Sequence, residues 1–244
     1  MQTNHFDASV AANYDADSTV MFDPALVGAT VDFLADLAGD GAALELGIGT
    51  GRIALPLSRR GVPVHGIDLS QDMVAQLQTK SGAEAIGVTV GDFAVTTVGR
   101  SFRLAYLVYN TIENLTTQDE QVACFCNVAT HLEPGGCFVI EVEVPQIRRL
   151  PPGDTVRAFL ATPTRVGFDE LDVARQSGVS HHYFFGEGRA ETFSMPYRYA
   201  WPAELDLMAR IAGLHLRERW AGWRREPFTS DSAAHVSVWE KPAS

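Results

Sequence analysis

The chain has 244 residues, of which 46% are hydrophobic, so it can bury the core of one large α/β domain with an insertion. Its formal net charge is −11 and it has no block of lysines or arginines. Because a phosphate backbone is neutralised by a basic surface, this balance argues against a nucleic-acid partner and favours a small-molecule substrate. No apolar run nears the length of a membrane span, so we expect a cytoplasmic protein with no membrane partner.

Cysteine and histidine usage gives no sign of a disulfide framework or a metal site. The three cysteines, Cys124, Cys126 and Cys137, are odd in number, which favours a reducing compartment. The seven histidines show no metal-binding spacing, and we predict no metal.

The first 23 residues form a polar stretch that carries Phe6, Tyr14 and Phe22. An amphipathic helix is predicted directly after it, from Pro24 to Leu37. The composition of the polar stretch is typical of a lid that closes over a site.

The most diagnostic segment is a short apolar strand, 42–46, that opens into a glycine-rich turn, 47–51. Glycines there allow a ligand to approach the bare backbone, and helical spacing resumes at 53–57. In the dinucleotide-binding turn the third glycine falls where this chain has Arg52. The pattern that begins at Glu45, E-x-G-x-G-x-G, instead resembles motif I of the class I S-adenosylmethionine-dependent methyltransferases.

The next two predicted strands supply further parts of a nucleoside site. The strand 62–68 ends in Asp68, at the place where an acid meets a ribose hydroxyl. The strand 86–90 is followed by Asp92 and Phe93, which resemble the family's adenine position. The resemblance implies that Asp92 accepts a hydrogen bond from the adenine amino group and that Phe93 covers the adenine ring.

The remaining core elements also follow the family order. A fourth strand is predicted from Phe102 to Tyr109, then a helix from Thr117 to His131 and a fifth strand from Cys137 to Val144. The turn before the fifth strand, Glu133-Pro134-Gly135-Gly136, resembles the turn that members of the family have at this place. The resemblance covers residues 40–146 closely and the last forty in outline.

Residues 148–200 are predicted to form an antiparallel β-insertion. Polar and apolar residues alternate over Thr164–Val173, Gly178–Phe185 and Arg189–Tyr199, with a turn at 186–188. The insertion resembles the β-structure that roofs the acceptor pocket in small-molecule methyltransferases. Its candidate ligand-facing residues are His181, His182, Tyr183, Arg198, Tyr199 and Trp201. Because neighbouring strand residues face opposite ways, the two histidines cannot both line one pocket.

The last segment completes the predicted fold. A helix from Pro202 to Gly213 precedes strands over Leu214–Trp223 and His235–Lys241, which match the family's sixth strand and antiparallel seventh strand. The predicted fold class is α/β, and the resemblance implies a Rossmann-like seven-stranded methyltransferase sheet with helices on both faces, an N-terminal lid and an inserted antiparallel β-element. The predicted divisions are 1–40 (lid and first helix), 41–147 (cofactor-binding core), 148–200 (substrate-binding insertion) and 201–244 (last helix and strands).

The resemblance implies S-adenosyl-L-methionine as the cofactor. The residues that it implies for binding are Glu45, Gly47, Gly49, Arg52, Asp68, Asp92, Phe93 and Tyr109. The segment Ala12-Asn13-Tyr14-Asp15 resembles the tyrosine-bearing lid of sugar and antibiotic N-methyltransferases. Tyr14 would orient the acceptor lone pair and pack near the sulfonium; the alternative is a hydrophobic staple for the first helix.

Glu113, directly after the fourth strand, lies at the carboxyl edge of the predicted sheet. It could hold an ammonium or accept a proton; the alternative is a solvated helix-cap residue. The predicted function is methyl transfer to a small-molecule acceptor, with the amine of a natural product or amino sugar favoured. Two alternatives stay open, an O-methyltransferase with His181 or His182 as base, and a non-catalytic S-adenosylmethionine sensor. Neither the acceptor nor the oligomeric state follows from the sequence.

Overall fold

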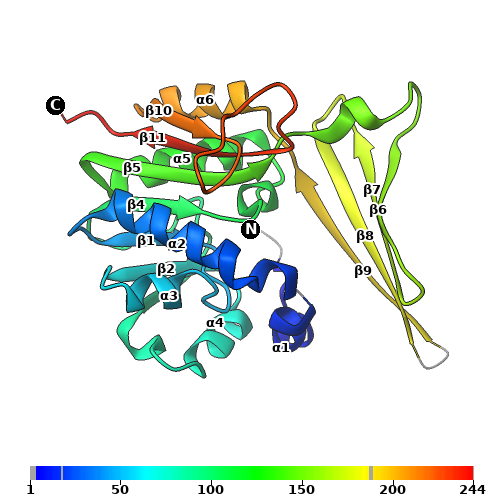
Figure 1. Ribbon diagram of the computed structural model, residues 1–244, viewed down its shortest axis with the longest axis horizontal. Helices are drawn as coiled ribbons and strands as arrows, with labels where there is room; N and C mark the ends of the chain where they lie inside the picture. Colours follow the sequence, from blue (N-terminus) through cyan, green and yellow to red (C-terminus); the bar gives the residue numbers. More distant parts are fainter. Residues whose placement is uncertain (1–3, 18, 187–188, 244) are drawn as a thin grey trace.

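The computed structural model describes residues 4–17, 19–186 and 189–243. It contains a seven-stranded sheet in the order β10-β11-β5-β4-β1-β2-β3 and a separate four-stranded sheet in the order β6-β7-β8-β9 (Figure 1). The second sheet stands beside the carboxyl edge of the first, and α1 lies beneath the gap between them. We call this second sheet the roof.

The strands and helices alternate along the chain as in a doubly wound fold. The strands of the large sheet are β1 Ala43–Leu46, β2 Val64–Asp68, β3 Gly87–Val90, β4 Phe102–Leu107, β5 Leu132–Glu143, β10 His215–Trp220 and β11 Ala234–Glu240. The roof strands are β6 Val156–Ala161, β7 Arg165–Asp172, β8 Ser177–Gly186 and β9 Arg189–Arg198. The helices are α1 Ala8–Asp17, η1 Thr19–Phe22, α2 Pro24–Ala38, α3 Ala54–Arg59, α4 Gln71–Gln78, η2 Ala83–Ala85, η3 Thr111–Asn114, α5 Gln118–His131, η4 Gln146–Arg149 and α6 Pro202–Ile211.

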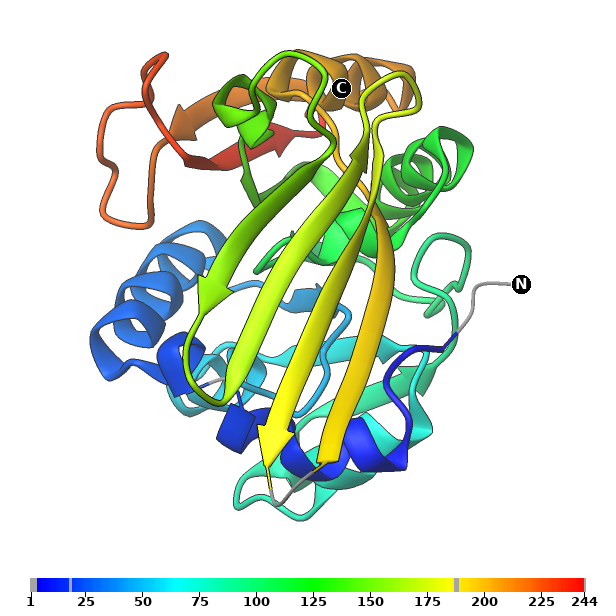
Figure 2. The same ribbon diagram turned by 90° about the vertical axis from the view of Figure 1, so that its right-hand side faces the viewer.

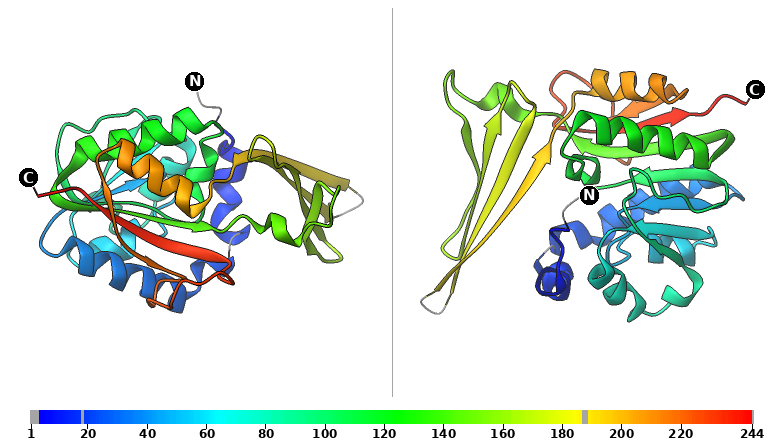
Figure 3. Two further views of the ribbon diagram at one scale, coloured as in Figure 1. Left: turned by 90° about the horizontal axis from the view of Figure 1, so that it is seen from above. Right: turned by 180° about the vertical axis from the view of Figure 1, so that it is seen from behind.

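Helices cover both faces of the large sheet (Figure 3). Buried side chains of α2, α3 and α4 pack in one apolar cluster, and those of α5 and α6 pack in the other. Local signals fix where these helices begin. Asp23 caps α2 by accepting from two backbone N–H groups, and Thr117 and Glu120 form a reciprocal capping box at α5.

The roof is an antiparallel sheet whose four strands run in chain order. In Figure 2 it lies in front of the carboxyl edge of the large sheet, with α1 behind its lower part. Its strand β9 also packs against η3, which follows β4. Two segments distant in sequence, the N-terminal helix and the roof, therefore enclose the same edge.

The predicted seven-stranded sheet is confirmed, and β11 runs antiparallel to β5 as expected. Three predictions of detail need correction. The roof has a further strand, β6, that was not predicted. A register shift between Ala158 and Leu160 interrupts the alternation of polar and apolar residues along this strand. The polar N-terminal stretch contains the helix α1, and β5 begins at Leu132 and includes the glycine turn. The predicted turn at 186–188 lies partly outside the described residues. No helix in the described part of the chain is long and apolar enough to cross a membrane.

Candidate functional site

One cavity of about 1080 Å³ lies between the carboxyl edge of the large sheet, α1 and the roof. The loops after β1, β2 and β4 supply its inner wall, and one face of the roof supplies its outer wall. In open α/β sheets this edge is where ligands bind. Four predicted residues from distant segments line it together: Tyr14, Asp68, Glu113 and His182.

The glycine turn after β1 lines the inner end of the cavity. Gly47 and Gly49 have φ of +69° and +56°, a region that favours glycine. A Cβ on Gly47 would lie 2.6 Å from the Thr111 side chain, so this position also has no room for one. Asp68 accepts from the Gly49 N–H at 2.7 Å and from the Ser70 N–H at 2.8 Å. The turn and the end of β2 are thus joined directly beside the cavity.

Glu45 lies behind this turn and is not among the lining residues. It is 2% exposed and accepts from the Tyr106 hydroxyl at 2.9 Å. Burial raises the pKa of Glu45 to about 8, although the Tyr106 hydrogen bond and nearby Arg52 oppose the shift. The structure therefore gives Glu45 contacts that support the turn, without placing it against the cavity.

Three other predicted cofactor residues differ in their placement. Phe93 is buried and lines the cavity, whereas Asp92 accepts from the Ala94 N–H at 2.9 Å in a turn and does not line it. Arg52 donates to the Met21 carbonyl at 3.0 Å, and its guanidinium lies 5.7 Å from the Tyr109 ring centroid. Arg52 thus connects η1 with the rim of the cavity.

Tyr109 and Asn110 form a strained turn after β4. Both are non-glycine residues with positive φ, +54° and +60°. Glu141 holds this turn, because it accepts from the Tyr109 N–H at 2.9 Å, and Asn110 accepts from the Glu143 N–H at 2.8 Å. The Tyr109 side chain lines the cavity and is half exposed.

The helix α1, with the residues just before it, covers the inner end of the cavity and is hydrogen-bonded to the core. Ser70 donates to the Phe6 carbonyl at 2.5 Å, and Lys80 pairs with Asp15 at 2.5 Å. Tyr14 on the same helix lines the cavity. Burial raises the pKa of Tyr14 to about 12, with a smaller opposing effect of Arg52, so the phenol stays protonated near neutral pH.

Three carboxylates gather in the part of the cavity under the roof. Glu113 follows β4, Glu143 ends β5 and Asp169 lies on β7, and all three line the cavity. Burial, then Glu143 and Asp169, raise the pKa of Glu113 well above its ordinary value. Burial also raises the pKa values of Glu143 and Asp169, although Arg157 opposes both shifts. We call Glu113, Glu143 and Asp169 the acidic group.

Two buried polar atoms that belong to cavity-lining residues have no hydrogen-bond partner among the described residues. They are Gln146 Oε1, an acceptor, and the Tyr199 hydroxyl, and both residues line the cavity. A buried acceptor without a donor is costly, so it indicates a ligand that carries N–H or O–H groups.

The predicted residues of the insertion do not gather at one place. His182 lines the cavity, while His181 lies on the opposite face of β8 and contacts Ser194. Arg198 is buried in an ion pair with Glu204 at 2.6 Å, and Trp201 precedes α6 with 37% exposure. Neither Arg198 nor Trp201 lines the cavity; Tyr199 does, and Tyr183 does not.

Sequence reasoning missed several cavity residues of the roof. Asp169, Arg157, Arg165 and Tyr197 all line it. Strand parity could have found two of them, because a hairpin that points His182 inward also points Arg165 and Asp169 inward. Among the described residues, no group of three or more histidine, cysteine or acidic side chains is arranged to hold a metal ion.

A profile of the methyltransferase domain matches residues 43–136. The solved structure of the CcbJ methyltransferase from Streptomyces caelestis is 35% identical, superposes with a TM-score of 0.88, and is covered over 99% of its length by 98% of this chain. The chain belongs to the S-adenosylmethionine-dependent methyltransferases. This methyltransferase is also 28% identical to the cypemycin N-terminal methyltransferase of a Streptomyces species, over 97% of both chains. The S-adenosylmethionine-bound CalS10 structure, an amino pentose methyltransferase from Micromonospora echinaspora, shares the fold, with a TM-score of 0.70 and 20% identity over 99% of both chains.

The inner end of the cavity fits the methyltransferase cofactor in its chemistry. It combines the partly exposed backbone of Gly47 and Gly49, the Asp68 carboxylate at the end of β2 and the buried Phe93 ring. These groups suit a ribose and an adenine and include no cluster of basic side chains for a diphosphate. When bound there, S-adenosylmethionine supplies an electrophilic methyl group on a sulfonium.

Proposed function

We propose that this enzyme methylates the nitrogen of an amine on a small-molecule natural product or amino sugar. The observation that carries the proposal is the acidic group, because its three carboxylates line the acceptor part of the cavity. Among the described residues, Arg157 is the arginine that opposes the raised pKa values of Glu143 and Asp169. An ammonium ion matches this field, and a neutral alcohol gains little from it. The orphan acceptor Gln146 Oε1 adds a partner for an N–H group.

Glu113 is the proposed base. An acceptor ammonium must lose a proton before its lone pair can attack, and a carboxylate with a raised pKa accepts a proton more readily than an ordinary one. The nitrogen lone pair then forms the new N–C bond while the C–S bond breaks and its electrons stay on sulfur. Glu143 and Asp169 would keep the positively charged product nitrogen in a favourable field.

Tyr14 is the proposed orienting group. Its phenol is protonated, and its pKa is influenced by Arg52, Tyr109 and Asp68, all of which border the cofactor end. The hydroxyl oxygen can accept from an acceptor N–H and so aim the lone pair, while α1 excludes water from the site. Alignment of this kind contributes roughly 7–11 kcal/mol of barrier reduction, so no metal is required.

The cypemycin relative supports this reading, because its name describes methylation at an N-terminus. A test compares pairs of small acceptors that differ only in an amine or a hydroxyl, with methyl-labelled S-adenosylmethionine as donor. We expect label in the amines alone, and a Glu113→Gln variant that is slow with them. Label in the hydroxyl compounds, lost in His182→Ala, would support the O-methyltransferase alternative. Tight cofactor binding without transfer to any acceptor would support a sensor.

A further inference from the structure

We propose that the acceptor also carries an anionic oxygen group, a carboxylate or a phosphate, and that Arg165 on the roof binds it. This inference rests on the proposed function, because it treats the acceptor amine as held by the acidic group. It is carried by the order of side chains along the cavity face of the roof.

The roof presents its cavity-facing residues in rungs, since residues opposite one another in register share a face. One rung holds Arg157, Asp169 and Ser180, the next holds Gly167, His182 and Phe193, and the third holds Arg165, Phe184 and Glu191. All of these except Gly167 line the cavity. Along β7, Asp169 and Arg165 are separated by about 13 Å at 3.3 Å per residue.

The middle rung separates the two charges with aromatic rings. A Cβ on Gly167 would lie 2.3 Å from the Phe159 ring, so that ring occupies the space above the glycine. Phe159 and Phe193 both pack against His182, at 5.3 and 6.1 Å between ring centroids. Burial, then Arg165, lower the pKa of His182, which favours the neutral ring. This part of the cavity suits the carbon skeleton of an acceptor.

Arg165 is partly buried and forms no ion pair with a carboxylate of the described residues. Arg198 and Arg219 are paired with Glu204 and Asp206, each at 2.6 Å. Arg165 instead donates to His182 Nδ1 at 3.2 Å and lies 4.8 Å from the Phe184 ring centroid. Glu191, at the far side of the same rung, forms no ion pair with it.

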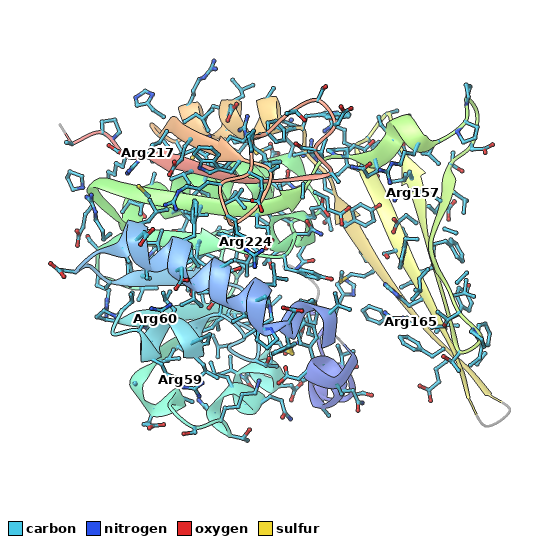
Figure 4. All side chains as sticks on the ribbon, in the orientation of Figure 1. Arg59, Arg60, Arg157, Arg165, Arg217 and Arg224 are labelled. Atoms are coloured by element: carbon cyan, nitrogen blue, oxygen red, sulfur yellow. The ribbon has the colours of Figure 1, made fainter. Side chains whose placement is uncertain are left out.

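The Nε atom of Arg165 is buried and has no hydrogen-bond partner among the described residues. The Phe184 ring and the His182 imidazole hold the Arg165 guanidinium in place, and its Nε–H group is free to donate a hydrogen bond. Such a group can bind an anionic oxygen. In Figure 4, Arg165 lies further from the core end of the roof than Arg157 does. The cavity thus has a carboxylate end near the core and a guanidinium end toward the hairpin tips.

Calorimetry with S-adenosylhomocysteine present tests this with n-octylamine, n-octanoate, ω-aminooctanoate and ω-aminooctyl phosphate as probes. We expect either bifunctional probe to bind at least about tenfold more tightly than n-octylamine. Arg165→Met should abolish that preference and Arg165→Lys should retain part of it. Arg175→Met, which removes an exposed arginine outside the cavity from the turn after β7, is the matched control and should keep it. A stronger phosphate probe would identify the anion as a phosphate, and a stronger carboxylate probe as a carboxylate.

The outcomes separate this inference from the proposed function. Binding of n-octylamine with no gain from either anionic group, or a gain that survives in Arg165→Met, would overturn the role of Arg165 and leave the amine site intact. Binding of n-octanoate that depends on Arg165, with no gain from the amine, would support the anion site and count against the amine. Absence of binding by both bifunctional probes, ω-aminooctanoate and ω-aminooctyl phosphate, would overturn the inference.

Discussion

Thr50 in the glycine turn donates a hydrogen bond to Asp15 on α1 at 2.6 Å. Lys80 completes the contact, because its ammonium group bonds to Asp15 and, at 2.8 Å, to the Thr50 carbonyl. One carboxylate therefore joins the lid to the loop that lines the cofactor end. We expect the ordering of α1 and the ordering of the turn to be coupled through these contacts.

The first prediction concerns that coupling. Asp15→Ala should weaken S-adenosylmethionine binding by about tenfold, since hydrogen bonds to a charged group contribute about 1.5–3 kcal/mol and solvent screening reduces this at a partly exposed site. Calorimetry measures it, with Asp40→Ala as a control that removes an equal charge from an exposed turn. Hydrogen exchange should show α1 better protected with cofactor than without; equal protection, with unchanged affinity in Asp15→Ala, would contradict the lid.

A second prediction tests whether the glycine turn contacts the cofactor, by comparing two glycines that have the same kind of backbone strain. Gly49→Ala and Gly61→Ala both place a side chain at positive φ, +56° and +92°, and should destabilise the fold by a similar 1–2 kcal/mol. Only Gly49 lines the cavity, so only Gly49→Ala should also lose cofactor affinity. Equal affinity in the two variants would show that the turn does not contact the ligand.

The third prediction tests Tyr14 and Glu113. Tyr14→Phe and Glu113→Gln should each lower turnover with an amine by roughly ten- to a hundredfold and leave cofactor affinity unchanged. Because the pKa of Glu113 is raised, its carboxylate form appears as pH rises, so wild-type turnover should rise through that pKa. Glu113→Gln should lose this limb of the profile, whereas Glu170→Gln on the opposite face of β7 should keep it. Normal turnover in both site variants would remove these residues from the mechanism.

The fourth prediction follows from Glu45. Its pKa is about 8 in the folded chain and 4.5 ordinarily, so between these values the folded state holds more protons than the unfolded state. The contribution of Glu45 to the free energy of unfolding is therefore complete below pH 4.5 and is lost as pH rises toward 8. At 1.36 kcal/mol per pKa unit, the loss is roughly 4 kcal/mol. Urea unfolding at about pH 5 and about pH 8 measures it. Glu45→Gln should flatten the decline and the exposed Glu133→Gln should not; equal slopes would contradict the assignment.

The core of the fold could be predicted because its signals are local. Strand runs, glycine turns and caps such as Thr117 before α5 each lie within a few residues, and their order identifies the sheet. The strand β6 could not be predicted, because the shift between Ala158 and Leu160 breaks its period of two. The helix α1 is capped by Asp7, which accepts hydrogen bonds from the Ser9 and Val10 N–H groups. It was not predicted because its apolar residues do not recur with a clear helical period.

Some residues of the candidate site could be predicted from the sequence and others could not. Asp68 and Glu113 end or follow strands of the large sheet, so topology alone brings them to one edge. Asp169 and Arg165 reach the cavity only because the whole roof folds back over that edge, a relation that no local pattern encodes. Arg198 illustrates the converse, because it lies at the end of β9 and its guanidinium is used by Gln121 and Glu204.

The position of the transferred methyl group tests the central claim most directly. The full chain is incubated with S-adenosylmethionine carrying a carbon-labelled methyl and with acceptors that hold an amine and a hydroxyl in one molecule, and the product is read by nuclear magnetic resonance. The acidic group predicts label on nitrogen only, at a rate that falls in Glu113→Gln. Label on oxygen, at a rate unchanged in Glu113→Gln, would contradict it.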